Sequence, residues 1–122
     1  MDAGALSSEK LVGLYLKRID AYDKRGPAIN TIVQINAAAL DEASALDRQR
    51  AASGISGRLH CIPVIVKDNF ETVGLQSAAG SLALKGFVST RDAFQVRRLK
   101  DEASVVLGYL IAFRRRNRRD RE

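Results

Sequence analysis

The feature that most constrains the fold is a short, uninterrupted apolar run, Ile-Pro-Val-Ile-Val, at residues 62–66. A strand with one face in water alternates apolar and polar residues, whereas a continuous apolar run is typical of a strand covered on both faces. Residues 104–107, Ser-Val-Val-Leu, have the same character. The two runs therefore predict a sheet buried between layers of other elements.

Amphipathic segments predict helices that could cover such a sheet. The first begins at Ser7 or Ser8, whose hydroxyl can cap amides of the first turn, and ends at Gly26-Pro27. Its apolar residues recur every three or four positions, which marks one stripe of a helix. They are Leu11, Leu14, Tyr15, Ile19 and Tyr22.

The remaining elements alternate between strands and helices. The β-branched residues at 31–35 predict a strand. A second helix is expected from about 37 to 50, with Leu40, Ala43 and Leu46 on its apolar face, and a third from an N-cap at Asp92. The order helix, strand, helix, strand, loop, helix, strand favours an α/β fold.

The positive charge of the chain is concentrated at its C-terminal end. Residues 114–122 carry six arginines and two acidic residues, so they hold +4 of the net charge of +6. The other 113 residues are nearly neutral, and the basic balance is therefore a property of the tail alone. A solvated, disordered end is the interpretation favoured for this segment, and RNA or another acidic surface is the alternative partner.

Composition excludes several classes of site. One cysteine, Cys61, allows no internal disulfide, and with one histidine, His60, the chain lacks the ligands of a structural zinc site. The longest apolar run, 105–113, is far shorter than the roughly 20 residues of a membrane-spanning helix. The N-terminus shows no secretory pattern, so the expected location is the cytosol.

Three short patterns are candidates for chemistry. Ser7-Ser8-Glu9-Lys10 contains a Ser-x-x-Lys spacing, but a helix cap accounts for both serines. The pair His60-Cys61 shows no base or orienting acid at a suitable spacing and is interpreted as structural. Lys67 ends the apolar run, where partial burial would favour a neutral amine that can act as a base. The alternative is a lysine that reaches water or pairs with Asp68.

The segment that contains Lys67 resembles the amidase signature family. Residues 57–69 read Gly-Arg-Leu-His-Cys-Ile-Pro-Val-Ile-Val-Lys-Asp-Asn, close to the family hallmark Gly-Pro-Leu-His-Gly-Ile-Pro-Val-Val-Val-Lys-Asp-Asn. Further matching blocks lie at 74–76, 79–81 and 92–99, and the likeness spans about residues 7 to 108. The resemblance implies that residues 1–108 are the N-terminal fragment of an amidase domain, an incomplete mixed sheet flanked by helices, with residues 109–122 as an unrelated, disordered basic tail.

This resemblance also implies an activity and a site. Family members hydrolyse the carbon–nitrogen bond of amides with a serine nucleophile, a second serine on a cis peptide bond and a lysine. Lys67 aligns with that lysine, whose implied role is to take a proton from the bridging serine. A small-molecule amide is the implied substrate, with no metal and no organic cofactor.

The chain departs from the family pattern in three places. The family continues beyond Gly108 into the segment with both catalytic serines, which residues 109–122 do not resemble. Cys61 stands where the family has glycine, and Glu102-Ala103-Ser104 replaces Ala-Gly-Ala. We therefore expect a truncated amidase of marginal stability, inactive alone, with the Glu102 carboxylate costly to bury. The alternative hypothesis is a small, non-enzymatic basic protein that binds nucleic acid through its arginine-rich tail.

Overall fold

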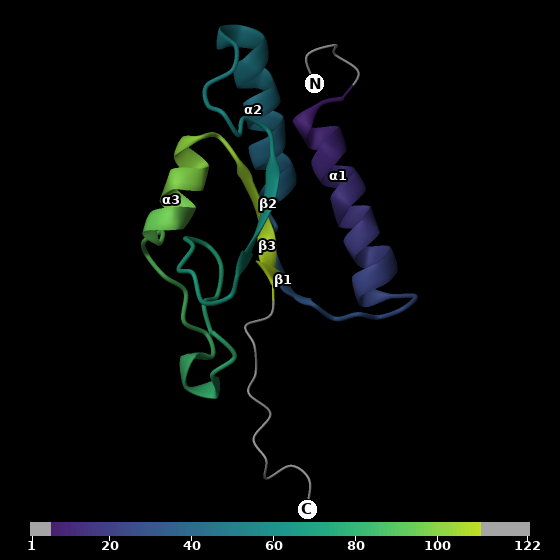
Figure 1. Ribbon diagram of the computed structural model, residues 1–122, viewed down its shortest axis with the longest axis vertical. Coiled ribbons are helices and arrows are strands. Elements are labelled where there is room, and N and C mark those ends of the chain that lie inside the picture. Colours follow the sequence, from purple (N-terminus) through teal and green to yellow (C-terminus); the bar gives the residue numbers. More distant parts are fainter. Residues whose placement is uncertain (1–5, 111–122) are drawn as a thin grey trace, which may run out of the picture.

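The computed structural model describes residues 6–110, which form a small sheet with helices on both faces (Figure 1). Helix α1 (Ser8–Ile19) runs on as a π-helical turn, Asp20–Lys24, and is followed by β1 (Ile32–Ile35) and α2 (Ala39–Ser53). Strand β2 (Pro63–Lys67), a 3-10 turn (Leu82–Leu84), α3 (Phe94–Asp101) and β3 (Val105–Leu110) complete the order. The expected alternation is confirmed, with element ends shifted by a few residues.

The sheet has the order β1-β3-β2, with β3 in the centre. Strand β2 pairs with β3 in parallel, with Val64 opposite Val106, while β1 pairs with β3 in the antiparallel sense. Each pairing contains one register shift, which lets the short strands bend around the packed helices. The fold is therefore a mixed sheet flanked by helices, as the family resemblance implied.

Side chains of β3 contribute to one core on each face of the sheet; the register shift after Val106 places Tyr109 on the same face as Val106. Val105 and Leu107 pack with Val12 of α1 and with Ala39 and Ala43 of α2. The other face is built from Val66, Leu75, Val96, Val106 and Tyr109. Because β3 is covered on both faces, its residues 105–107 can be apolar throughout. The expectation of cover on both faces is not met for the 62–66 run within the described residues, since Ile62 and Ile65 are 41% and 44% exposed.

Strand β1 approaches β3 closely at a glycine. A Cβ built on Gly108 would lie 2.2 Å from the carbonyl oxygen of Gln34, far inside contact distance. Only a residue without a side chain therefore allows the two backbones to meet here.

A buried carboxylate holds the end of the first helix against β1. Asp23, in the π-helical turn, accepts hydrogen bonds from the backbone N–H of Thr31 at 2.6 Å and of Ile32 at 3.2 Å, and from the Thr31 hydroxyl at 2.7 Å. Burial alone would raise the pKa of Asp23. The bonds from Thr31, Lys24 and Ile32 outweigh burial and lower this pKa far below its ordinary value.

Helix α1 buries a different stripe from the one that the sequence predicted. Val12 is fully buried and Leu16 packs beside it against α2 and β3. The predicted stripe is largely open, because Leu14 is 53%, Tyr15 46% and Tyr22 55% exposed. The helix is apolar on two adjacent sides, and the side with Val12 and Leu16 faces α2, where Ala39 and Ala43 permit close approach.

Two polar expectations were wrong. Asp92 does not cap α3, because the N-cap position is Ala93. The Asp92 carboxylate instead accepts the Val73 N–H at 2.8 Å and bonds the Lys100 ammonium at 2.9 Å. Glu102 is not an unpaired buried charge, because its half-buried carboxylate accepts the backbone N–H of Arg58 at 2.8 Å. Both carboxylates bond backbone amides of loops distant in sequence.

The C-terminal strand continues past Gly108 to Leu110, and Tyr109 is completely buried. The unrelated, disordered tail was expected to begin at residue 109, but residues 109 and 110 belong to β3, and residues 111–122 lie outside the described residues. Within residues 6–110, no helix is long and apolar enough to cross a membrane.

Candidate functional site

Lys67 is the last residue of β2, at the carboxyl end of the parallel strand pair. It lies opposite Leu110, the last residue of β3. Its side chain is exposed, so no described residue provides the partial burial that the sequence argument required. The expected placement at a strand end is observed, whereas the catalytic role of Lys67 stays a prediction.

The backbone around Lys67 is fixed by its neighbour Asp68. Asp68 is 5% exposed, and its two carboxylate oxygens accept the N–H groups of Ala78 at 3.1 Å and Gly80 at 3.3 Å. The Asp68 N–H donates to the carbonyl of Leu110 at 3.0 Å. Asp68 thus joins the end of β2 to β3 and to the following loop. The alternative of an ion pair between Lys67 and Asp68 is not observed among the described residues.

The same loop is held on two further sides. The Gln34 side-chain oxygen on β1 accepts the Gln76 N–H at 2.9 Å. The Tyr109 hydroxyl donates to the Phe70 carbonyl at 2.6 Å and bonds Ser77 at 2.9 Å. A small polar pocket of about 200 Å³ remains between these groups, lined by Val33, Gln34, Asp68 and Gln76.

Sequence reasoning missed Asp68 as an anchor of the loop and considered it only as a partner for Lys67. A carboxylate directly after a buried strand and before a glycine-containing loop was the available signal. Its partners are backbone amides ten and twelve residues away, which no side-chain pattern reveals.

Three serine hydroxyls in or near this loop have structural partners. Ser77 bonds the Tyr109 hydroxyl, while Ser89 donates to Arg91 O at 2.9 Å and Ser104 to Leu99 O at 2.8 Å. Ser7 accepts the Lys10 N–H at 3.1 Å, so the Ser-x-x-Lys spacing is a helix cap. Among residues 6–110, no serine hydroxyl is hydrogen-bonded to the Lys67 side chain.

His60 and Cys61 are buried next to the helix layer. The His60 ring bonds the Ser56 hydroxyl at 2.9 Å and the Leu46 carbonyl at 3.2 Å. Burial raises the pKa of the Cys61 thiol, whose sulfur lies 3.9 Å from the Asp47 carboxylate. A buried thiol of raised pKa is a poor nucleophile, which supports a structural role for Cys61. Both nitrogens of the His60 ring have hydrogen-bond partners in the fold.

Two positions where the resembled family has glycine adopt left-handed backbone conformations. Cys61 has φ of 68° and Ala103 has φ of 59°. The Cys61 N–H donates to the Ala103 carbonyl at 3.0 Å. This hydrogen bond connects the segment before β2 to the end of α3. Both positions therefore keep a left-handed backbone conformation that glycine adopts without strain and that is unfavourable for Cys61 and Ala103 because they carry a Cβ.

No group of three potential metal-ligating side chains occurs among residues 6–110. The site defined by the described residues is Lys67 at the end of β2, next to the buried Asp68, whose carboxylate binds backbone amides of the following loop.

Solved structures of amide-hydrolysing enzymes share this arrangement of elements. The peptide amidase of Stenotrophomonas maltophilia superposes with a TM-score of 0.85 at 44% identity, over 88% of this chain and 22% of that one. An amidase family protein of Bacillus anthracis gives 0.84 at 39% identity, over 89% and 22%. The fold is thus that of one part of an amidase.

Sequence comparison gives the same result. Residues 10–110 match the family model described as Amidase, and the chain therefore belongs to the amidase family. Indoleacetamide hydrolase of Bradyrhizobium diazoefficiens is 35% identical over 87% of this chain and 20% of its own length. One component of the glutamyl-tRNA(Gln) amidotransferase of Azoarcus sp. is 42% identical over 88% and 22%. The chain spans about a fifth of the length of these relatives.

Proposed function

We propose that this chain supplies the lysine-bearing part of an amidase, which hydrolyses the carbon–nitrogen bond of a small-molecule amide. The observation that carries the proposal is the place of Lys67. It ends a parallel strand inside the family-matched segment 10–110, within the thirteen-residue block that resembles the family hallmark.

In the proposed reaction, Lys67 acts through its neutral amine. Its Nζ accepts a proton from a bridging serine, which takes one from the nucleophilic serine as that oxygen attacks the amide carbon. The proton then passes to the leaving amine, and water hydrolyses the acyl-enzyme. Both serines come from the part of an amidase that lies outside residues 6–110. That part also has to cover the exposed Lys67 side chain, because burial favours the neutral amine.

Asp68 supports this role as a positioning residue. By accepting the N–H groups of Ala78 and Gly80, it fixes the backbone from which Lys67 projects. A fixed base lowers the cost of aligning the reacting groups.

The test is a chimera in which residues 7–110 replace the matching segment of the Stenotrophomonas maltophilia peptide amidase. We expect the chimera to hydrolyse peptide amides and Lys67→Ala to lower kcat by about 10²–10⁴-fold. Lys85→Ala, which removes an exposed lysine of the 82–88 loop, is the matched control and should leave kcat unchanged. A folded chimera whose activity survives Lys67→Ala would overturn the proposal.

The relatives differ in the substrates that their names state, among them indoleacetamide and glutamyl-tRNA(Gln). We therefore propose the amide class and no single substrate, a reaction without metal or organic cofactor, and a cytosolic location.

The nucleic-acid alternative rests on residues 114–122, which lie outside the described part of the chain. It stays a prediction, tested by a salt titration of RNA binding with the whole chain and with a chain lacking this segment. Binding that survives the deletion would contradict it.

A further inference from the structure

The loop between α2 and β2 holds a serine and a histidine in direct contact, apart from the candidate site at Lys67. The Ser56 hydroxyl oxygen lies 2.9 Å from Nδ1 of His60. Ser56 is exposed, whereas His60 is only 7% exposed. A hydroxyl that solvent can reach is therefore bonded to a ring that is packed into the fold.

The hydrogen bonds around the His60 ring determine which nitrogen carries the proton. Nε2 lies 3.2 Å from the Leu46 carbonyl oxygen, which can only accept a hydrogen bond, so Nε2 is the donor. The backbone N–H of Ser56 donates to Nδ1 at 3.4 Å, and this bond requires a lone pair on Nδ1. Neutral His60 therefore carries its proton on Nε2, and Nδ1 accepts the hydrogen bond of the Ser56 hydroxyl.

This geometry is that of an activated nucleophile. In such sites a hydroxyl lies about 2.6–3.2 Å from a base, and a third group orients that base. Here Ser56 is the hydroxyl, Nδ1 of His60 is the base, and the Leu46 carbonyl of α2 orients the ring. The sequence alone did not reveal the pair, because the orienting group is a backbone carbonyl that no side-chain pattern shows.

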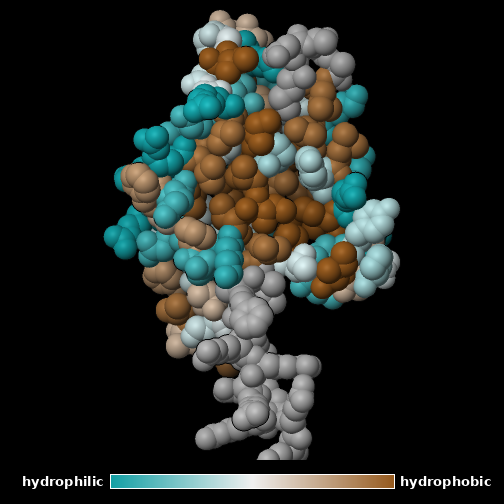
Figure 2. All heavy atoms as spheres, in the orientation of Figure 1, coloured by the Kyte–Doolittle hydropathy of each residue, from teal (hydrophilic) through white to brown (hydrophobic). Residues whose placement is uncertain are grey.

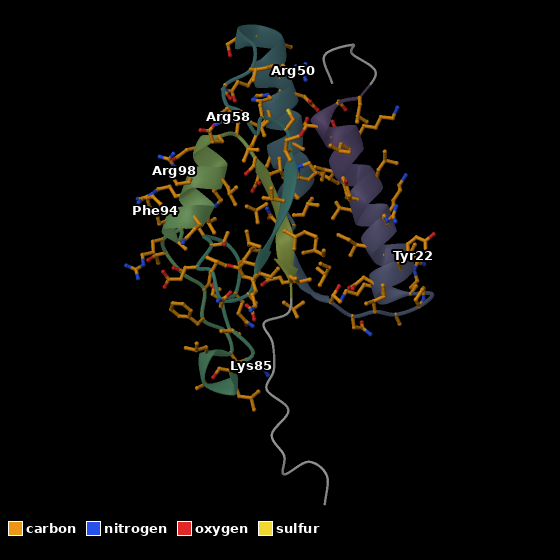
Figure 3. The ribbon with its side chains drawn as sticks, viewed as in Figure 1. Tyr22, Arg50, Arg58, Lys85, Phe94 and Arg98 are labelled. Carbon is orange, nitrogen blue, oxygen red and sulfur yellow. The ribbon has the colours of Figure 1, made fainter. Side chains whose placement is uncertain are left out.

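Glu102, directly after α3, holds the loop that carries this pair. Its carboxylate accepts the Arg58 N–H at 2.8 Å, and its backbone carbonyl accepts the Leu59 N–H at 3.1 Å. Gly57 lies against the same backbone, because a Cβ built there would be 2.6 Å from the Glu102 carbonyl oxygen. Figure 3 shows Arg58 next to the end of α3 to which the loop is bonded. A loop fixed in this way keeps the serine and the histidine aligned before any reaction.

The loop lies on a hydrophilic side of the molecule. Figure 2 shows hydrophilic side chains over α3 and beside the end of α2, whereas apolar side chains gather over the middle of this face. Among residues 6–110, the backbone N–H of Gly57, the residue after Ser56, has no hydrogen-bond partner. A reagent in water can therefore reach the Ser56 oxygen, and a backbone donor follows directly in the chain for a developing oxyanion.

We propose that Ser56 is an acyl-acceptor site, at which the serine oxygen takes an acyl group from an activated ester with His60 as the general base. The Ser56 oxygen attacks the ester carbonyl carbon while its proton moves to Nδ1 of His60. The bond from that carbon to the leaving oxygen then breaks, and the proton passes from Nδ1 to the leaving group. The products are acyl-Ser56, the released alcohol or phenol, and neutral His60. This step does not use Lys67, so the inference does not depend on the proposed function.

The test treats the whole 122-residue chain with 4-nitrophenyl acetate and follows acetylation at each serine by mass spectrometry of peptides. Ser53, at the end of α2, is the matched internal control, because it is exposed and its hydroxyl donates to the Gln49 carbonyl at 3.0 Å instead of to an imidazole. We expect Ser56 to be acetylated at least about 10²-fold faster than Ser53, the lower end of what a general base contributes. His60→Gln should abolish this difference, since an amide cannot take the proton, and Ser53→Ala should leave the acetylation of Ser56 unchanged.

Two outcomes would overturn the inference: equal rates at Ser56 and Ser53 in the folded wild type, or fast acetylation of Ser56 that persists in a folded His60→Gln chain. Circular dichroism of each variant checks the fold. Because replacing a buried ring can unfold the chain, the wild type in concentrated urea is the second comparison. There both serines should react at one rate, since the pair with His60 exists only in the folded state. A difference that persists in urea would also overturn the inference, because local sequence would then be its cause.

Discussion

Ala103, directly after the C-cap of α3, adopts the left-handed conformation that glycine adopts without strain, at φ of 59°. This conformation costs an L-residue roughly 1–2 kcal/mol. We expect Ala103→Gly to raise the free energy of unfolding by about 1 kcal/mol, measured by urea denaturation.

The control for this substitution is Ala45→Gly, at an exposed position inside α2. There the same change should lower stability by about 0.5–1 kcal/mol, because glycine is unfavourable in a helix interior. Equal destabilisation by both substitutions would show that Ala103 carries no strain.

Asp23 makes the stability of the chain depend on pH. Hydrogen bonds lower its pKa in the folded state, so its contribution is complete above the ordinary carboxyl pKa of about 3.9. It is lost as the pH falls through and below that value, because the unfolded chain binds the proton first. In urea denaturation between pH 7 and pH 3, the stability difference between the wild type and Asp23→Asn should shrink as the pH falls.

Asp101→Asn, which removes an exposed carboxylate at the end of α3, is the matched control. Its pH dependence should follow that of the wild type. A constant difference between wild type and Asp23→Asn across this range would contradict the assignment.

Among the secondary-structure elements, the pairing of β1 with β3 depends on Gly108. A methyl group there would lie 2.2 Å from Gln34 O, so Gly108→Ala should lower stability by about 1–3 kcal/mol and weaken amide protection in β1. Gly13→Ala is the opposite case, since an added Cβ in α1 meets nothing within 4 Å. It should stabilise the chain by about 1 kcal/mol. A neutral Gly108→Ala would show that the two strands are not in this close contact.

Sequence patterns predicted the existence and order of the elements well, because apolar runs and helix caps are local signals. The buried face of α1 was predicted wrongly, since periodicity alone cannot rank two adjacent apolar stripes. Asp92 was predicted as a cap because aspartate suits that position, but its partners lie at Val73 and Lys100. Local propensity was overridden by contacts between distant segments.

For the molecule as a whole, the part of the candidate site that lies in residues 57–69, the block that resembles the family hallmark, was predicted from the sequence. That block marks Lys67 at the end of β2, but not the bonds by which Asp68 fixes the next loop, because those link backbone amides. Leu14, Tyr15 and Tyr22 are exposed, β1 and β2 each pair with β3 alone in the described residues, and the chain matches about a fifth of each relative.

Amide hydrolysis by the purified 122-residue chain alone is the decisive measurement. A panel of aryl and aliphatic amides would be assayed for the wild type and for Lys67→Ala. We predict no turnover above that of Lys67→Ala, because both serines of the proposed reaction lie outside residues 6–110. Turnover that disappears in Lys67→Ala would contradict this prediction, and would mean that a serine within these 122 residues completes the site.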